Sequence, residues 1–132
     1  MSSTPIAALP AAVLAAISIT WAFAQGKPAE TDDGQIAFNN ACRTCHTMRQ
    51  GDNRLGPNLH KIIGRKAGSE PGYGYSSAMK DAGIVWDKVT LDRFIAKPDE
   101  VVPGHNMKPY GGIASAEDRG KIVSYLEASG GN

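Results

Sequence analysis

The chain has 132 residues, of which 42% are hydrophobic and 20% charged, and its net charge is +1 at neutral pH. This length suffices for one domain with a modest core, and so small a net charge argues against a nucleic-acid binder, whose surface is strongly basic. The 15 glycines and 8 prolines predict short helices joined by many turns. A chain this small and rich in loops usually needs a covalent or metal staple.

The N-terminal segment carries no Lys, Arg, Asp or Glu and is mostly apolar. The small residues Ala22 and Ala24 form a cleavage-site pattern at its end. We therefore predict a secretory signal over residues 1–24 and a mature domain over residues 25–132, although no basic residue precedes the apolar run. The alternative is an uncleaved membrane anchor, because residues 5–24 are about as long as a bilayer-spanning helix. Both interpretations place the domain outside the cytoplasm.

The first helix of the domain is predicted to start near two acidic residues. Asp32 or Asp33 can cap a helix that runs to about Cys42. Gly34 and Phe38 are four residues apart on this helix and therefore share one face. Because Gly34 has no side chain, another helix can approach closely at that point.

The helix leads into Cys42-Arg43-Thr44-Cys45-His46, which reads C-x-x-C-H, the attachment pattern of haem c. Two thiols at this spacing add to two vinyl groups of a porphyrin, and the histidine that follows donates a ring nitrogen to the iron. A disulfide between these cysteines would close only a tiny loop, and no second ligand pair offers a zinc site. A thioredoxin-like motif is the remaining alternative, but the sequence lacks the βαβ pattern that it needs.

Two further helices are predicted in the C-terminal half, and no segment indicates a strand. The first covers residues 91–96 and stops before Lys97-Pro98. The second runs from Ser115, as its N-cap, to Ala128. Its apolar residues recur at i, i+3 and i+4, which gives the helix one buried face. These residues are Ile122, Tyr125 and Leu126.

The loop between these helices holds a candidate for the second axial ligand of a haem iron. Met107 is flanked there by Pro and Gly residues, which fix and bend the backbone, and it lies far enough along the chain to reach the other face of the ring. Met48 is too close to His46 to do so. His60 and His105 are rival ligands, and His105 is the stronger rival because it shares the loop with Met107.

With these motifs in this order, the chain resembles class I cytochrome c, of the mitochondrial type and the short periplasmic bacterial type. The resemblance runs from Gly34 to Leu126 and includes a methionine loop that ends at Met107. It implies an all-α class I fold, in which the N- and C-terminal helices pack against each other and short helices and loops wrap one covalent haem c. The matching segments are Gly34-x₃-Phe38-x₃-Cys42, C-x-x-C-H, Gly56-Pro57-Asn58-Leu59-His60, Gly64-Arg65-Lys66, Pro71-Gly72-Tyr73-Gly74-Tyr75-Ser76, Trp86 and Pro103-Gly104-x₂-Met107.

The resemblance also implies roles for residues around the ring. The carbonyl oxygen of Pro57 would accept a hydrogen bond from His46, which fixes the tautomer of the ligand. Tyr75 and Trp86 would donate hydrogen bonds to a haem propionate, and Arg65 would offset the charge of that propionate. His60 is expected to be structural or exposed.

A His46/Met107 pair leaves no open position on the iron, so an electron carrier is favoured over an enzyme. The resemblance implies a monomeric periplasmic shuttle that takes electrons from a cytochrome bc complex and passes them to a terminal oxidase or a photosynthetic reaction centre. One alternative is a membrane-anchored electron donor to an oxidase. The other is a haem peroxidase or ligand sensor in which Met107 can be displaced.

At several places the chain departs from the family pattern. Phe94 stands where the family often has tyrosine, and Met79 where it often has asparagine, so fewer polar groups are left to hold a buried water. His105 replaces a small hydroxyl residue. Asp99 and Glu100 stand where mitochondrial-type proteins carry lysines around the haem edge, which predicts weak electrostatic steering of partners.

Overall fold

The structure is a computed structural model that describes residues 1, 3–5, 7–8 and 29–130. The predicted signal segment lies almost wholly outside these residues and stays a prediction. Within the described part of the chain, no helix is long and apolar enough to cross a membrane.

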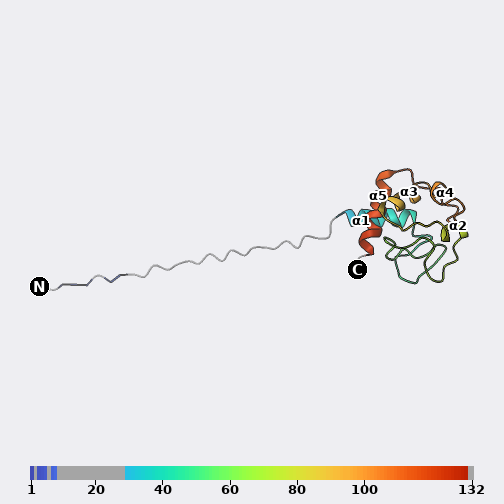
Figure 1. The fold of residues 1–132 in the computed structure, drawn as a ribbon. Helices are drawn as coiled ribbons and strands as arrows, with labels where there is room; N and C mark the ends of the chain where they lie inside the picture. Colours follow the sequence, from blue (N-terminus) through green and yellow to red (C-terminus); the bar gives the residue numbers. More distant parts are fainter. Residues whose placement is uncertain (2, 6, 9–28, 131–132) are drawn as a thin grey trace.

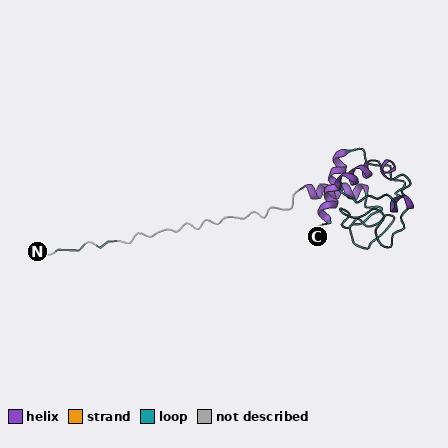
Figure 2. Ribbon diagram, viewed as in Figure 1, coloured by secondary structure: helices purple, strands orange, loops and turns teal. Residues whose placement is uncertain are grey.

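All the helices except the second gather on one side of the domain, and the long stretch of chain between the first and third helices forms the other (Figures 1 and 2). In chain order they are α1 (Ala29–Ala41), α2 (Ser77–Lys80), α3 (Lys88–Ala96), α4 (Pro98–Val101) and α5 (Ala116–Ser129). The extended pairing seen over residues 29–130 is a single isolated bridge between Lys66 and Val85. The predicted all-α class is therefore confirmed.

The first and last helices cross each other, as the sequence predicts (Figure 1). At the crossing, a Cβ atom on Gly34 would lie 2.7 Å from the carbonyl oxygen of Lys121 and 2.9 Å from the Cβ of Tyr125. Any side chain at Gly34 would therefore push α1 away from α5. Beside this contact the rings of Phe38 and Tyr125 pack with their centroids 5.3 Å apart.

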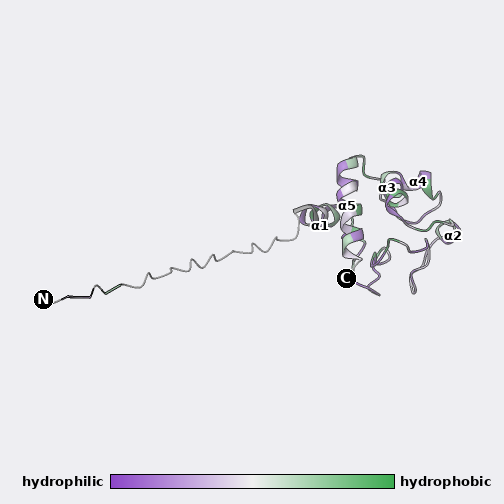
Figure 3. Cartoon of the chain, turned by 60° about the vertical axis from the view of Figure 1, so that its left-hand side comes forward, coloured by the Kyte–Doolittle hydropathy of each residue, from purple (hydrophilic) through white to green (hydrophobic). Residues whose placement is uncertain are grey.

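The last helix begins at its predicted cap. The hydroxyl oxygen of Ser115 accepts a hydrogen bond from the backbone N–H of Asp118 at 3.2 Å. Ile122 and Leu126 are almost completely buried, whereas Glu117 and Asp118 in the first turn are exposed. Figure 3 shows the same division as green and purple stretches along α5.

The starts of two helices differ from the prediction. Helix α1 begins at Ala29, so Asp32 and Asp33 lie inside its first turns. Their negative charges are still favourable there, because they lie near the positive end of the helix dipole. Helix α3 begins before residue 91 because Asp87 and Thr90 form a reciprocal capping box with bonds of 2.7 and 2.8 Å.

Both one-turn helices, α2 and α4, went unpredicted because four residues show no periodicity. The end of α3 before Lys97-Pro98 is as predicted.

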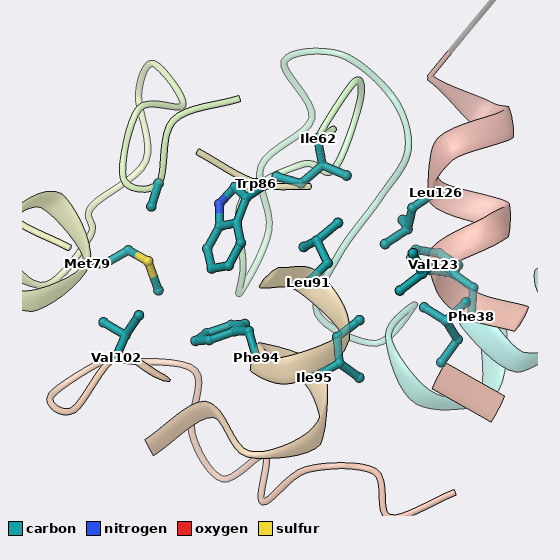
Figure 4. Close-up of a cluster of buried hydrophobic side chains, with 12 residues drawn as sticks. Phe38, Ile62, Met79, Trp86, Leu91, Phe94, Ile95, Val102, Val123 and Leu126 are labelled. Atoms are coloured by element: carbon teal, nitrogen blue, oxygen red, sulfur yellow. The ribbon is translucent and has the colours of Figure 1, made fainter. Parts of the chain in front are cut away.

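The core is one apolar cluster that runs from the α1–α5 crossing to α2 (Figure 4). Leu91 lies near its middle, with Phe38 and Leu126 on the side of the helix pair and Met79 on the other side. Trp86 and Phe94 pack with their ring centroids 5.1 Å apart. This second half of the core forms the floor of the site described next.

Candidate functional site

A cavity of about 470 Å³ opens between the helices and the loops. Its size falls in the range of cofactor sites, and most of its wall is apolar. Helices α3 and α5 contribute Leu91, Phe94, Ile95, Ile122 and Leu126. The rest of the wall comes from the C-x-x-C-H segment, from the loop that follows it and from the loop that contains Met107.

The two cysteines reach the cavity from a turn at the end of α1. The backbone N–H groups of Cys45 and His46 both donate to the carbonyl oxygen of Cys42, at 3.1 and 2.9 Å, so all three residues face one space. Both cysteines are free. Burial, and to a lesser degree Cys45, raises the pKa of Cys42 to about 11. A thioredoxin-like pair needs the opposite shift, so this site does not resemble one.

His46 is oriented by its neighbours. A side chain at Gly56 would overlap the His46 ring, so the ring lies directly on the backbone there. The Nδ1 atom is 2.7 Å from the carbonyl oxygen of Pro57, as predicted. Because a carbonyl only accepts, Nδ1 carries the proton and Nε2 keeps a free lone pair. The pKa of His46 is lowered, chiefly by burial; the hydrogen bond to Pro57 opposes this shift, and the charge of Arg65 adds to it. The ring is therefore held neutral, which is the form that binds metals.

Met107 enters the cavity wall from a loop that is held at both ends. At the start, the N–H of His105 donates to the carbonyl of Val102 at 3.1 Å across Pro103-Gly104, with Gly104 at φ 88°. Proline followed by a glycine of positive φ is the sequence of a type II turn. Met107 lies beyond this bend, as its flanking Pro and Gly residues predict.

The far end of the loop is held by Tyr110, which sequence reasoning missed. Its hydroxyl donates to the carbonyl of Ile95 at 2.6 Å, and the N–H of Ile113 donates to the same carbonyl at 3.0 Å. Burial raises the pKa of Tyr110 to about 12, which keeps the hydroxyl protonated. A tyrosine just after the Met-Lys-Pro sequence is the only signal that pointed to it.

Neither rival histidine lines the cavity. His105 is buried, with Nδ1 2.9 Å from the N–H of Met107 and Nε2 3.2 Å from Asp99. Its ring packs edge-to-face with the ring of Phe94. From the sequence, His105 is a rival of Met107 as a ligand of the iron. In the structure its ring accepts a hydrogen bond from the backbone of Met107. His60 is partly buried, and its carbonyl oxygen accepts a bond from Arg65.

The chain is similar to proteins of known family over most of its length. Residues 29–126 match the family described as cytochrome c oxidase, cbb3-type, subunit III. Cytochrome c2 of Rhodopila globiformis is 40% identical over 100 residues, which are 76% of this chain and 93% of that protein. Cytochrome c of Cochliobolus lunatus is 38% identical over 106 residues, 80% of this chain and 94% of that protein. The chain belongs to the cytochrome c family.

A solved structure agrees with this assignment. Cytochrome cH from Methylobacterium extorquens superposes with a TM-score of 0.68 and 34% identity, over 74% of this chain and 97% of that one. The predicted resemblance to class I cytochrome c is confirmed. The protein is thus a haem c electron carrier and not an enzyme, and Cys42 and Cys45 occupy the attachment positions of its single covalent haem.

Arg65 has polar partners within its own chain. The guanidinium lies in the cavity wall, but it donates to Glu70 Oε2 at 3.0 Å, to the carbonyl of Asn58 at 2.7 Å and to that of His60 at 3.2 Å. Two of its five N–H donors are left. The charge of Arg65 is paired with Glu70, an acid in a polar turn that no motif marks, and its role beside a propionate stays a prediction.

The two predicted propionate donors, Tyr75 and Trp86, both line the cavity. The Tyr75 oxygen accepts the N–H of Glu70 at 3.3 Å, so its own hydrogen stays available. Burial, as the main cause, raises the pKa of Tyr75 and keeps that hydrogen in place. Trp86 is held beside Arg65 by a backbone bond of 2.9 Å to its carbonyl.

The residues present fit a haem. An apolar chamber suits the porphyrin, the free thiols of Cys42 and Cys45 lie at its wall, and a neutral imidazole offers a free Nε2. Met107 adds a thioether to the same chamber, and Met79 and Phe94 add apolar surface. Tyr75, Trp86 and Arg65 add polar donors, which suit the carboxylates at the polar edge of the ring.

Proposed function

We propose that this cytochrome is a monomeric one-electron shuttle of the periplasm with His46 and Met107 as its axial ligands. It would carry electrons from a cytochrome bc complex to a terminal oxidase or a photosynthetic reaction centre. The observation that supports this proposal is that His46, whose Nε2 keeps a free lone pair, and Met107 line one apolar cavity from segments far apart in the sequence.

Bound haem supplies a reversible one-electron couple at the iron. The chain's residues hold it and shield it. Cys42 and Cys45 would fix the ring through thioether bonds, and Pro57 would keep Nε2 of His46 directed at the metal. A thioether as the second ligand favours the reduced state and raises the potential. Because both axial positions would be filled, no substrate binds at the metal.

Carbon monoxide tests the ligation. We expect the reduced protein at neutral pH to show no spectral change with carbon monoxide, and the oxidised protein to show the weak absorption band of methionine bound to ferric haem. The variant Met107→Ala should lose that band and bind carbon monoxide, which controls for access to the cavity. Ready binding by the wild-type protein would favour the ligand-sensor or peroxidase class instead.

Intact mass tests the location. Native protein from the periplasmic fraction should have the mass of residues 25–132 plus one haem. Recovery in the membrane fraction, with residues 1–24 retained, would identify a membrane-anchored electron donor. The same spectrum reports haem attachment, so the two questions are answered from one sample.

A further inference from the structure

The residue two places before Met107 is buried although it is a histidine in a loop. The turn over Val102–His105 carries the His105 side chain inward, where its exposed fraction is 0%. Its ring packs on that of Phe94 in an edge-to-face arrangement, with the centroids 5.7 Å apart and the planes at 76°. Each nitrogen of a buried imidazole needs a polar partner, so the partners of the two nitrogens indicate the role of the residue.

The first nitrogen binds the backbone of the proposed ligand. The N–H of Met107 is 2.9 Å from Nδ1 of His105. A backbone N–H can only donate, so Nδ1 accepts and the ring carries its proton on Nε2. This single contact satisfies the Met107 amide and fixes the position of its Cα relative to the turn.

The second nitrogen faces an acid. Nε2 of His105 is 3.2 Å from Oδ1 of Asp99, but the contact lacks the alignment of a hydrogen bond, and within residues 29–130 it is the one buried side-chain nitrogen or oxygen without such a partner. The attraction is therefore electrostatic. Asp99 is held in turn by Lys108, whose Nζ donates to both carboxylate oxygens at 2.6 and 2.8 Å. Lys108 chiefly, and His105 to a lesser extent, lower the pKa of Asp99, so the acid is a carboxylate.

We propose that His105, oriented by Asp99, is a positioning residue that clamps the Met107 backbone in the place from which its sulfur reaches the iron. The proposal rests on the proposed function, because the clamp matters to the iron where Met107 is its ligand. Without the clamp, the loop would open more often. A competing ligand binds the iron in proportion to the open fraction, so its apparent affinity measures the clamp.

The test uses the haem-loaded protein and two readouts. One is the affinity of the oxidised protein for imidazole, and the other is the hydrogen-exchange rate of the Met107 amide in the reduced protein. His105→Leu keeps the bulk but removes the acceptor, so it should raise both by roughly tenfold or more, the factor that corresponds to loss of one buried hydrogen bond. His105→Asn places an oxygen near the position of Nδ1 and should restore most of the wild-type values.

A milder variant avoids the buried site. Asp99→Asn changes an exposed acid and should raise both readouts by a few-fold, since it removes the charge that orients the ring. Its matched control, Glu100→Gln, changes the neighbouring acid, which pairs with Lys97, and should leave both unchanged. Wild-type values for His105→Leu, or equal effects of Leu and Asn, would overturn the clamp.

The two proposals fail separately. A wild-type protein without the methionine band refutes Met107 ligation, whatever the variants do. The exchange rate of the Met107 amide is measured without a competing ligand, so the comparison of His105→Leu with His105→Asn tests the hydrogen bond whether or not Met107 binds the iron.

Discussion

The two sides of the cavity are held in different ways. On the His46 side, a network of directional bonds fixes the loop: Asn58, only 1% exposed, donates to Glu70 and accepts from Arg65. On the Met107 side the wall is apolar, and a few backbone bonds fix the loop, among them the one to His105. We infer that the histidine side determines how firmly the protein folds, whereas the methionine side tunes potential and ligand exchange.

Loss of the haem would remove what both sides surround, and it is the largest effect that we expect. Cys42→Ala combined with Cys45→Ala should give a protein without covalent haem, because both thioether bonds are lost. The measurement is the mass of the denatured protein. The control is Arg43→Ala, which changes an exposed residue inside the motif and keeps both thiols. A haem-bearing mass in the double variant would refute the attachment site.

The polar network should contribute most of what the histidine side adds to stability. Glu70→Gln leaves the Arg65 guanidinium, 16% exposed, without its anionic partner. We expect the free energy of unfolding to fall by about 2–3 kcal/mol, the range for breaking a largely buried pair that keeps some hydrogen bonds. Denaturation of the haem-loaded protein by guanidinium measures it.

The control for this variant is the exposed acid Glu100, since Glu100→Gln should change stability by less than about 0.5 kcal/mol. The contrast between the two sides adds a second criterion. Glu70→Gln should leave the affinity for imidazole unchanged, whereas His105→Leu should raise it. Similar stability of the two glutamate variants would show that the network does not stabilise the histidine side.

Local signals in the sequence predicted the helix pair and its close approach at Gly34, and the resemblance to class I cytochrome c implied the bond from His46 to Pro57. Both depend on residues close in the chain or on a glycine that permits contact, as Gly34 does. The predicted starts of α1 and α3 were wrong because several polar residues in each segment can cap a helix. The capping box that settled α3 joins Asp87 to Thr90, outside the apolar pattern that marked the helix.

The partners of Arg65 and His105 lay beyond sequence reasoning. Glu70 and Asp99 stand in polar turns, and their spacing from the residues they meet fits no recurring motif. Whether a buried charge meets a haem carboxylate or an acid of its own chain depends on the path of the loop. Burial of His105 likewise follows from the turn at Gly104 and from its packing against Phe94, which no local pattern reveals.

The apolar wall on the methionine side should set the reduction potential. Phe94 and Met79 are 6% and 9% exposed, and both line the cavity. Phe94→Tyr and Met79→Asn would add polar groups that stabilise the oxidised haem, which carries one more positive charge. We expect each to lower the midpoint by roughly 20–60 mV, about 0.5–1.4 kcal/mol for one electron.

Potentiometry measures this shift, in samples that keep the methionine band. Val89→Thr, an exposed change on the same helix as Phe94, should leave the midpoint in place. Unchanged midpoints in both Phe94→Tyr and Met79→Asn would mean that these side chains only fill space.

The smallest effect that we expect is the salt dependence of electron transfer at the outer surface of the methionine side, because the charges there cancel. Lys108 pairs with Asp99, and Lys97 pairs with Glu100 at 2.8 Å. At distances beyond a Debye length of about 8 Å the segment is neutral, whether or not each exposed pair persists in solution. A neutral rim steers neither anions nor cations toward the haem edge.

Small redox reagents test this without a choice of partner. Electron-transfer rates with a ferrocyanide-type anion and with a ruthenium hexaammine cation should each change by less than about threefold between low and physiological salt. Glu100→Lys adds two positive charges beside the edge, so it should speed the anion, slow the cation and steepen both salt dependences. A steep fall in the anion rate with salt in the wild-type protein would contradict this prediction. It would mean that Arg43 or another cation makes the rim basic, and that the rim suits partners whose own surface is acidic.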